Sequence, residues 1–260
     1  MYCKEGFLSM RKFGFTLAEI LITLGIIGVV AALTLPSLIT KHQKKVAATQ
    51  LKETYSIVYQ ALERAKVEHG DFSTWEMYYG QTLGSDYKQY LKTVVDKYFI
   101  PYVNTKQNIG FISLKNLGYD NIYTLDGKPS SSRLTETSYY VVPLSNGSIL
   151  RFIFASGCPS DEYITDENGN NIACKGDVTA GDIFVYIDIN GSKKPNTDAK
   201  DIFVMRYNTN GLQFWGCELK TPNRRQEILN TQCKKGAHRT GYCGCVIMLD
   251  GWEIKDDYPW

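Results

Sequence analysis

Histidine is scarce in this chain, with only His42, His69 and His238 among 260 residues. The chain also lacks a Gly-x-Ser-x-Gly nucleophile pattern, a glycine-rich phosphate loop and a His-Glu-x-x-His metalloprotease pattern. These absences remove the usual sequence signs of hydrolytic, nucleotide-dependent and zinc-dependent catalysis. The sequence therefore gives no argument for an enzyme, and its 18 tyrosines and four tryptophans suit packing and subunit contacts instead.

Excess charge is almost absent as well, since the whole chain carries a formal net charge of +2. Residues 1–14 hold Lys4, Arg11 and Lys12 against Glu5, which gives 3 − 1 = +2. The rest of the chain is therefore +2 − 2 = 0. A neutral protein offers no electrostatic argument for a nucleic acid partner.

Long apolar runs are missing except for one, which extends from Phe15 to Leu35. It contains 21 residues, and Glu19 is its only ionisable side chain. A helix of this length crosses a hydrocarbon core about 30 Å thick. No small-residue cleavage site follows the run, which argues against an ordinary secretory signal. Instead, a short basic segment, residues 10–14, directly precedes the apolar run.

The residues at the start of this run resemble the class III signal of type IV pilins and pseudopilins. Gly14 stands at the position before the cleavage, and Phe15 stands where the new N-terminus becomes N-methylated. Glu19 then matches the fifth mature residue. Gly28 and Pro36 fall where many pilins have the glycine and proline that bracket a locally loosened piece of helix.

The resemblance implies a structural subunit of a type IV pilus-like or type II secretion pseudopilus filament. It also implies the partners: identical or related pilin subunits, a prepilin peptidase, an inner-membrane assembly platform, and membrane lipid before assembly. The implied location is the bacterial inner membrane, with the globular domain outside the cytoplasm, and then a pilus or pseudopilus at the cell envelope or surface. The alternative is a singly membrane-anchored ectodomain that binds a ligand, or calcium, without polymerising.

Glu19 raises an energetic question of its own. A lone carboxylate at membrane depth costs about 3 kcal/mol or more, so it persists only with a partner or a function. The resemblance implies that Glu19 pairs with the charged N-terminus of Phe15 on a neighbouring subunit, so that two groups costly to bury singly neutralise one another. The alternative is a tolerated polar residue that faces a neighbouring helix.

Cysteine is limited to seven residues, an odd number. Cleavage after Gly14 removes Cys3, and a start at Met10 never includes it, so six cysteines remain either way. An exported domain in an oxidising compartment favours an even number of cysteines and disulfide bonds. The disulfide candidates are Cys158, Cys174, Cys217, Cys233, Cys243 and Cys245.

The pairing of these six cysteines is open from the sequence alone. Proximity favours Cys158 with Cys174, across an acidic, glycine-rich turn. One alternative is a zinc site built from Cys217, Cys233, His238, Cys243 and Cys245. The Cys-x-Cys spacing is unusual for zinc, however, and exported thiols tend to oxidise. The other alternative is a redox role for the Cys-Gly-Cys pair.

The pattern after Pro36 predicts a helix that continues to about His69, with Gly70 as its stop. Because proline lacks a backbone donor, Pro36 is expected to kink or locally open this helix. Apolar residues recur at spacings of four and three on one face, which predicts that this half packs on a core. They are Leu51, Tyr55, Val58, Leu62 and Ala65. No Pro/Gly/Ser-rich spacer interrupts the chain, which favours one continuous spine over an anchor joined by a linker.

The remainder predicts an α+β domain. A helix is expected from Asp86 to Phe99, and a β-hairpin is expected on either side of Asn146-Gly147. Further strands are predicted at 183–189, 202–207, 211–215 and 246–249. An antiparallel sheet of four or more strands would pack on the spine helix. The predicted organisation is a leader (1–14), a transmembrane and assembly helix (15–36), an amphipathic spine helix (37–70) and a globular pilin-like domain with disulfides (71–260).

One loop between two of these strands, from Asp188 to Asp201, has the composition of a binding site. The loop offers oxygen ligands of the kind that calcium prefers, from Asp188, Asn190, Asn196, Asp198 and Asp201. The spacing is not that of an EF-hand, and hydrogen bonding within the loop explains the same residues. Calcium therefore stands beside a purely structural loop as an alternative, and no other cofactor is predicted.

Overall fold

The protein is described by a computed structural model. It describes residues 14–75, 87–106, 109–130, 132–154, 163–165, 171–174, 182–218, 221–237 and 240–260. The chain divides into two units, 1–43 and 44–260. The side chains of Ser132, Thr240 and the segments 163–165 and 171–174 are not described.

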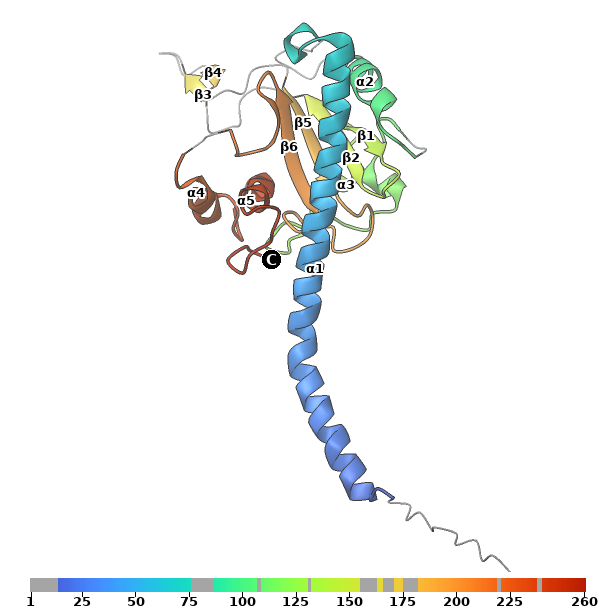
Figure 1. Cartoon of the computed structure of the whole chain (residues 1–260). Coiled ribbons are helices and arrows are strands. Elements are labelled where there is room, and N and C mark those ends of the chain that lie inside the picture. The colour runs from blue at the N-terminus through green and yellow to red at the C-terminus, as the bar shows by residue number, and fades with distance from the viewer. Residues whose placement is uncertain are drawn as a thin grey trace, which may run out of the picture. The chain divides into compact units, whose positions relative to one another are not determined.

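Helix α1 (Leu17–His69) is a single uninterrupted element of 53 residues (Figure 1). Its end agrees with the prediction. The N–H of Gly70 donates to the carbonyl of Lys66 at 2.9 Å, and Gly70 has a φ of +82°, which glycine adopts without strain. The continuous spine predicted from the sequence is therefore confirmed as a helix.

A five-stranded antiparallel sheet forms the centre of the second unit, with strand order β1-β2-β5-β6-β7. The hairpin predicted around Asn146-Gly147 joins its first two strands, and Gly147 has a φ of +97° in the turn. The strands are β1 (Tyr140–Pro143), β2 (Ile149–Phe154), β5 (Ile183–Asp188), β6 (Ile202–Asn208) and β7 (Gly211–Phe214). A separate pair, β3 (Tyr163–Thr165) and β4 (Asn171–Cys174), forms a two-stranded sheet.

One face of the five-stranded sheet packs on the second half of α1, which crosses the strands in Figure 1. Tyr55 on the helix stacks on Phe214 of β7, with ring centroids 5.5 Å apart. The predicted apolar face of the helix is confirmed, because four of its five residues are at most 4% exposed and Tyr55 is half-buried. The same core includes Leu150, Phe152, Val185, Ile187, Phe203 and Met205.

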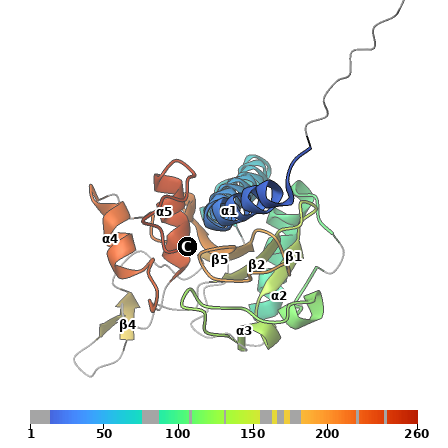
Figure 2. The same ribbon diagram turned by 90° about the horizontal axis from the view of Figure 1, so that it is seen from below.

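The opposite face of the sheet is covered as well, by the segment that leads to α3 (Ser132–Thr135) (Figure 2). Ile149 and Ile202 of the sheet contribute to a second buried cluster with Leu114 and Tyr119, near the short helix η3 (Leu114–Leu117). Because both faces are covered, all seven residues of β6 are buried. This explains why β6 shows no alternation of polar and apolar residues.

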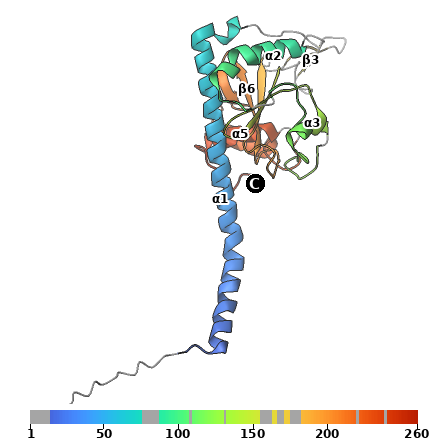
Figure 3. The same ribbon diagram turned by 90° about the vertical axis from the view of Figure 1, so that its right-hand side faces the viewer.

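Shorter helices close the ends of the domain. Helix α2 (Tyr87–Tyr98) contacts β1 and β2 and lies at the end of the sheet where α1 finishes (Figure 3). The helix predicted at 86–99 is thus confirmed within the described residues. Helix α4 (Arg224–Thr231) packs beside α5 (Cys243–Leu249). Three single turns, η1 (Phe72–Thr74), η2 (Ile100–Tyr102) and η4 (Thr240–Tyr242), complete the elements.

The strand predicted at Val246–Leu249 is wrong, because these residues form the second half of α5. A four-residue apolar run cannot distinguish a strand from a buried helix by its period. Two disulfides at the start of α5 supply the missing constraint: Cys233–Cys243, and Cys217–Cys245 with its Cα atoms 5.5 Å apart.

These two disulfides also settle the alternatives for four of the cysteines. All four sulfurs are in disulfide bonds, so the zinc site and the Cys-Gly-Cys redox pair predicted as alternatives are not formed. Gly244 between the two cysteines is required by packing, since a Cβ there would lie 2.4 Å from Cδ1 of the Phe214 ring. The predicted pair of Cys158 with Cys174, and His238 of the zinc alternative, fall outside the residues whose side chains are described.

Candidate functional site

The first half of α1 presents apolar side chains that nothing else in the described part of the chain covers. Phe15 is 83% exposed and Leu33 is 77% exposed, whereas Leu51 of the same helix is fully buried. Within that part, α1 is the one helix long and apolar enough to cross a membrane by length and composition. A Cβ added at Gly25 or Gly28 would meet no atom within 4 Å. Within the described part of residues 1–43, no contact explains these apolar side chains.

Glu19 lies in the first turn of this helix and makes a capping box with Thr16. Its carboxylate accepts hydrogen bonds from the backbone N–H and the hydroxyl of Thr16, both at 2.8 Å. The Thr16 hydroxyl oxygen in turn accepts from the N–H of Glu19 at 3.2 Å. The sequence reading missed this role, although Thr16-Leu17-Ala18-Glu19 fits the Ser/Thr-x-x-Glu capping pattern. Glu19 thus has a partner inside its own chain.

Pro36 lies inside α1, and the helix is not interrupted there. The local opening predicted from the sequence is therefore not formed in this helix, whereas the alternative, a kink at Pro36, stays a prediction. Two threonine hydroxyls near Pro36 donate hydrogen bonds to backbone carbonyls of the helix. Thr34 donates to the carbonyl of Val30 and Thr40 donates to that of Pro36, each at 2.9 Å. Neither bond replaces the missing N–H of Pro36, because its usual acceptor in an α-helix is the carbonyl of Ala32. Gly14 and Phe15 are exposed just before the helix begins.

The loop between β5 and β6 places the predicted oxygen ligands in two different settings. Asp198 forms an ion pair with Arg133 at 2.8 Å. Asp188 instead accepts a hydrogen bond from the Tyr119 hydroxyl at 2.8 Å. Asp201 accepts from the N–H groups of the loop itself. The structure thus separates Asp198 from the other two carboxylates.

Burial dominates the electrostatics of these two carboxylates. The pKa of Asp188 is raised to about 8, mainly by desolvation on burial and to a smaller extent by the nearby charge of Asp201. Burial likewise raises the pKa of Asp201 to about 6, against hydrogen bonds that lower it. Among the described residues, no group of three or more His, Cys, Asp or Glu side chains is placed to hold a metal ion. A cation here would therefore also need amide oxygens.

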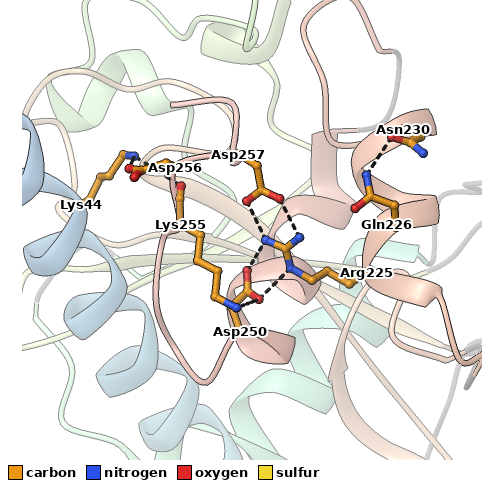
Figure 4. A network of polar contacts seen from close by, with 8 residues as sticks. All are labelled: Lys44, Arg225, Gln226, Asn230, Asp250, Lys255, Asp256 and Asp257. Carbon is orange, nitrogen blue, oxygen red and sulfur yellow. Dashed lines mark hydrogen bonds and ion pairs between the residues drawn. The ribbon is translucent and has the colours of Figure 1, made fainter.

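An ion-pair network fixes the last residues of the chain to the helices (Figure 4). Arg225 of α4 donates to Asp250 at 2.7 Å and to Asp257 at 2.7 and 2.8 Å. Lys255 also pairs with Asp250 at 2.7 Å. Because the Asp250 side chain is only 2% exposed, these partners compensate the desolvation of its charge.

Replacing Arg225 by alanine is expected to destabilise the domain by about 1–3 kcal/mol, because the buried Asp250 carboxylate loses a bidentate partner. Asp256→Ala is the control. Its carboxylate is fully exposed and lies 3.4 Å from Lys44, so its loss is expected to leave the free energy of unfolding close to that of the wild type. Urea unfolding of the detergent-solubilised chain measures both. Equal losses in the two variants would contradict the importance of burial at Asp250.

Comparison with known proteins adds two findings. A prokaryotic N-terminal methylation motif matches residues 9–35, and it is the prepilin-type signal of type IV pilins and pseudopilins. No curated protein and no solved structure matches the chain. A family of unknown function, DUF6613, matches residues 37–260. The chain, an α+β protein with a pilin-like arrangement and a prepilin-type signal, therefore belongs to the DUF6613 family.

Proposed function

We propose that this protein is a structural subunit of a type IV pilus-like or pseudopilus filament. In this proposal a prepilin peptidase cleaves after Gly14, and the new amino group of Phe15 becomes methylated. The first half of α1 then bundles with the same helix of identical or related subunits, while the globular unit remains outside. The catalytic steps belong to the processing and assembly partners.

The observation that carries the proposal is the exposed apolar half of α1 combined with the motif at 9–35. Membrane lipid covers such a helix before assembly, and neighbouring helices cover it afterwards. Gly25 and Gly28 face open space within the chain, and small residues of this kind let helix backbones approach closely in apolar surroundings. They therefore support helix bundling better than a solitary anchor.

The proposal places Glu19 opposite the methylated N-terminus of Phe15 on an adjacent subunit. Methylation preserves the charge of the amine, so the pair stays ionic. The proposed location follows from the same steps: an inner-membrane anchor with an external domain first, and a filament at the cell envelope later. An assembly platform with an ATPase would extract the subunit from the lipid.

Mass spectrometry of the mature N-terminus tests the processing steps. The chain extracted from membranes is expected to begin at Phe15 with one added methyl group. The measurement is repeated after reduction to count the disulfides, two of which are present in the described residues. Deletion of the prepilin peptidase is the control and is expected to leave residues 1–14 attached.

A chain that begins at Met1 or Met10 in cells that contain the peptidase would contradict the proposal. The second candidate function, a singly anchored ectodomain that binds a ligand, would then be favoured. Its support is that residues 44–260 form a compact unit with its own core. Ligand binding by membranes that contain no filaments would distinguish it.

A further inference from the structure

The inner end of the β5–β6 loop buries oxygen atoms that its hydrogen bonds do not use. Asp188 ends β5 and is 5% exposed, while Asp201 precedes β6 and is 2% exposed. The amide oxygens of Asn190 and Asn196 are buried in the same loop, and neither has a hydrogen-bond partner in the described part of the chain. A buried polar atom without a partner is costly, so it requires an explanation.

Direct contacts connect these four residues. The N–H of Asn190 donates to Oδ1 of Asp188 at 3.2 Å, and the Asn190 side chain hydrogen-bonds to Asp201. The N–H of Asn196 donates to Oδ2 of Asp201 at 2.7 Å. Asn190 therefore bridges the two carboxylates, and Asn196, which is 2% exposed, adjoins the second one.

Among the described residues, the positive side chains nearby make no ion pair with these two carboxylates, although the charge of Arg151 acts to lower the pKa of Asp188. Arg133 forms an ion pair with Asp198, and Arg151 lies against the rings of Tyr139 and Tyr186, at 4.9 and 5.2 Å from their centroids. The two buried carboxylates of Asp188 and Asp201 thus share a site without an ion pair to either arginine. Two like charges in one buried site repel each other unless a counter-charge or a proton separates them.

We infer that Asp188, Asp201, Asn190 and Asn196 form a calcium site. Calcium prefers carboxylate and amide oxygens, tolerates irregular geometry and completes its six to eight ligands with backbone carbonyls or water. Two carboxylates neutralise its charge. For their unused oxygens to face the ion, the two amides turn and give up the bond from the Asn190 side chain to Asp201 and the bond from the Asn196 amide nitrogen to the carbonyl of Ser192. The hydroxyl of Tyr119 holds Asp188 in place as a positioning residue.

The inference narrows the set of oxygen ligands predicted from the sequence, because Asp198, which pairs with Arg133, is left out. It also gives the ion a structural effect. The N–H of Tyr123 donates to the carbonyl of Asn196 at 2.8 Å, and the N–H of Asp198 donates to the carbonyl of Tyr123 at 2.9 Å. Calcium bound in the loop would therefore fasten the segment that covers the second face of the sheet. This role is independent of filament assembly.

The test is calcium titration of the full chain in detergent, purified with a chelator, followed by calorimetry and by thermal unfolding. With only two carboxylates, the expected Kd is about 10⁻⁴ to 10⁻³ M. Calcium at about ten times the Kd is expected to raise Tm by about 2–4 °C, and magnesium at the same concentration by less. Terbium luminescence sensitised by Tyr119 gives a second readout, because the tyrosine contacts a ligand.

Two variants with the same loss of charge make the test specific. Asp188→Asn is expected to weaken calcium binding by at least about tenfold and to abolish the terbium signal, whereas Asp198→Asn is expected to bind as the wild type does. Asn196→Ala is expected to weaken binding less than Asp188→Asn. The inference is overturned if the wild type shows no calcium-dependent change up to about 10 mM. It is also overturned if Asp188→Asn and Asp198→Asn lose binding equally.

Discussion

Glu19→Gln is expected to insert into the membrane and to be processed normally, but to form almost no filaments. Glutamine can replace glutamate in a capping box, so the contact with Thr16 is preserved while the charge is lost. The proposed partner, the charged amine of Phe15 on a neighbouring subunit, is then left unpaired. Breaking a buried ion pair costs about 3–5 kcal/mol, which is more than about 100-fold in each association step.

Thr16→Ala is the matched control, because it removes the capping partner and leaves the carboxylate. Loss of a cap costs about 1 kcal/mol, so the filament yield is expected to remain close to that of the wild type. Sheared filaments and membrane fractions are quantified for both variants, together with the mature N-terminus. Normal filaments from Glu19→Gln, with few from Thr16→Ala, would show that the cap matters and the charge pair does not.

Removal of the Cys217–Cys245 disulfide is the second change with a large expected effect. The bond joins residues 28 apart in sequence, and loop-closure entropy then gives a loss of about 3.6 kcal/mol in the free energy of unfolding. The Cys233–Cys243 bond spans 10 residues and gives about 2.7 kcal/mol. Alanine at both positions of a pair avoids the burial of a new hydroxyl group.

Urea unfolding of the full chain in detergent, followed by tryptophan fluorescence, measures both double variants. Trp252 is a suitable reporter because its ring lies 5.9 Å from that of Phe214, beside α5. Cys3→Ser is the control and is expected to leave the midpoint unchanged, because the proposed cleavage removes Cys3. Two double variants as stable as the control would show that packing alone holds α5 on the sheet.

The parts of the fold that the sequence predicted well are those with an unambiguous period. The apolar face of α1 recurs every three or four residues, and the hairpin around Asn146-Gly147 combines alternation with a characteristic turn. Both appear in the structure as expected. Helix α5 was missed because the period of a four-residue apolar run does not distinguish a strand from a buried helix.

For the candidate sites too, features with a local sequence signal could be predicted, and features that depend on residues distant in sequence could not. The motif around Gly14 and Phe15 is readable because it is a local signal in a fixed order. The capping box of Thr16 and Glu19 was equally local and could have been recognised. The separation of Asp198 from Asp188 was not predictable, because it depends on Arg133 and Tyr119, which are distant in sequence and reach the loop only through the fold.

The hydrogen bonds between Thr16 and Glu19 affect the free-energy cost of keeping an unassembled subunit in the membrane. A carboxylate that already accepts two hydrogen bonds from its own helix start is less costly to keep in the bilayer than a bare one. In the proposed pathway, a monomer in the membrane would therefore need no second protein to compensate the charge of Glu19. In the proposed assembly, Glu19 would exchange its bonds to Thr16 for an ion pair with the Phe15 amine of a neighbouring subunit. The contribution of Glu19 to assembly would then be the difference in free energy between these two interactions, and not the full free energy of the ion pair.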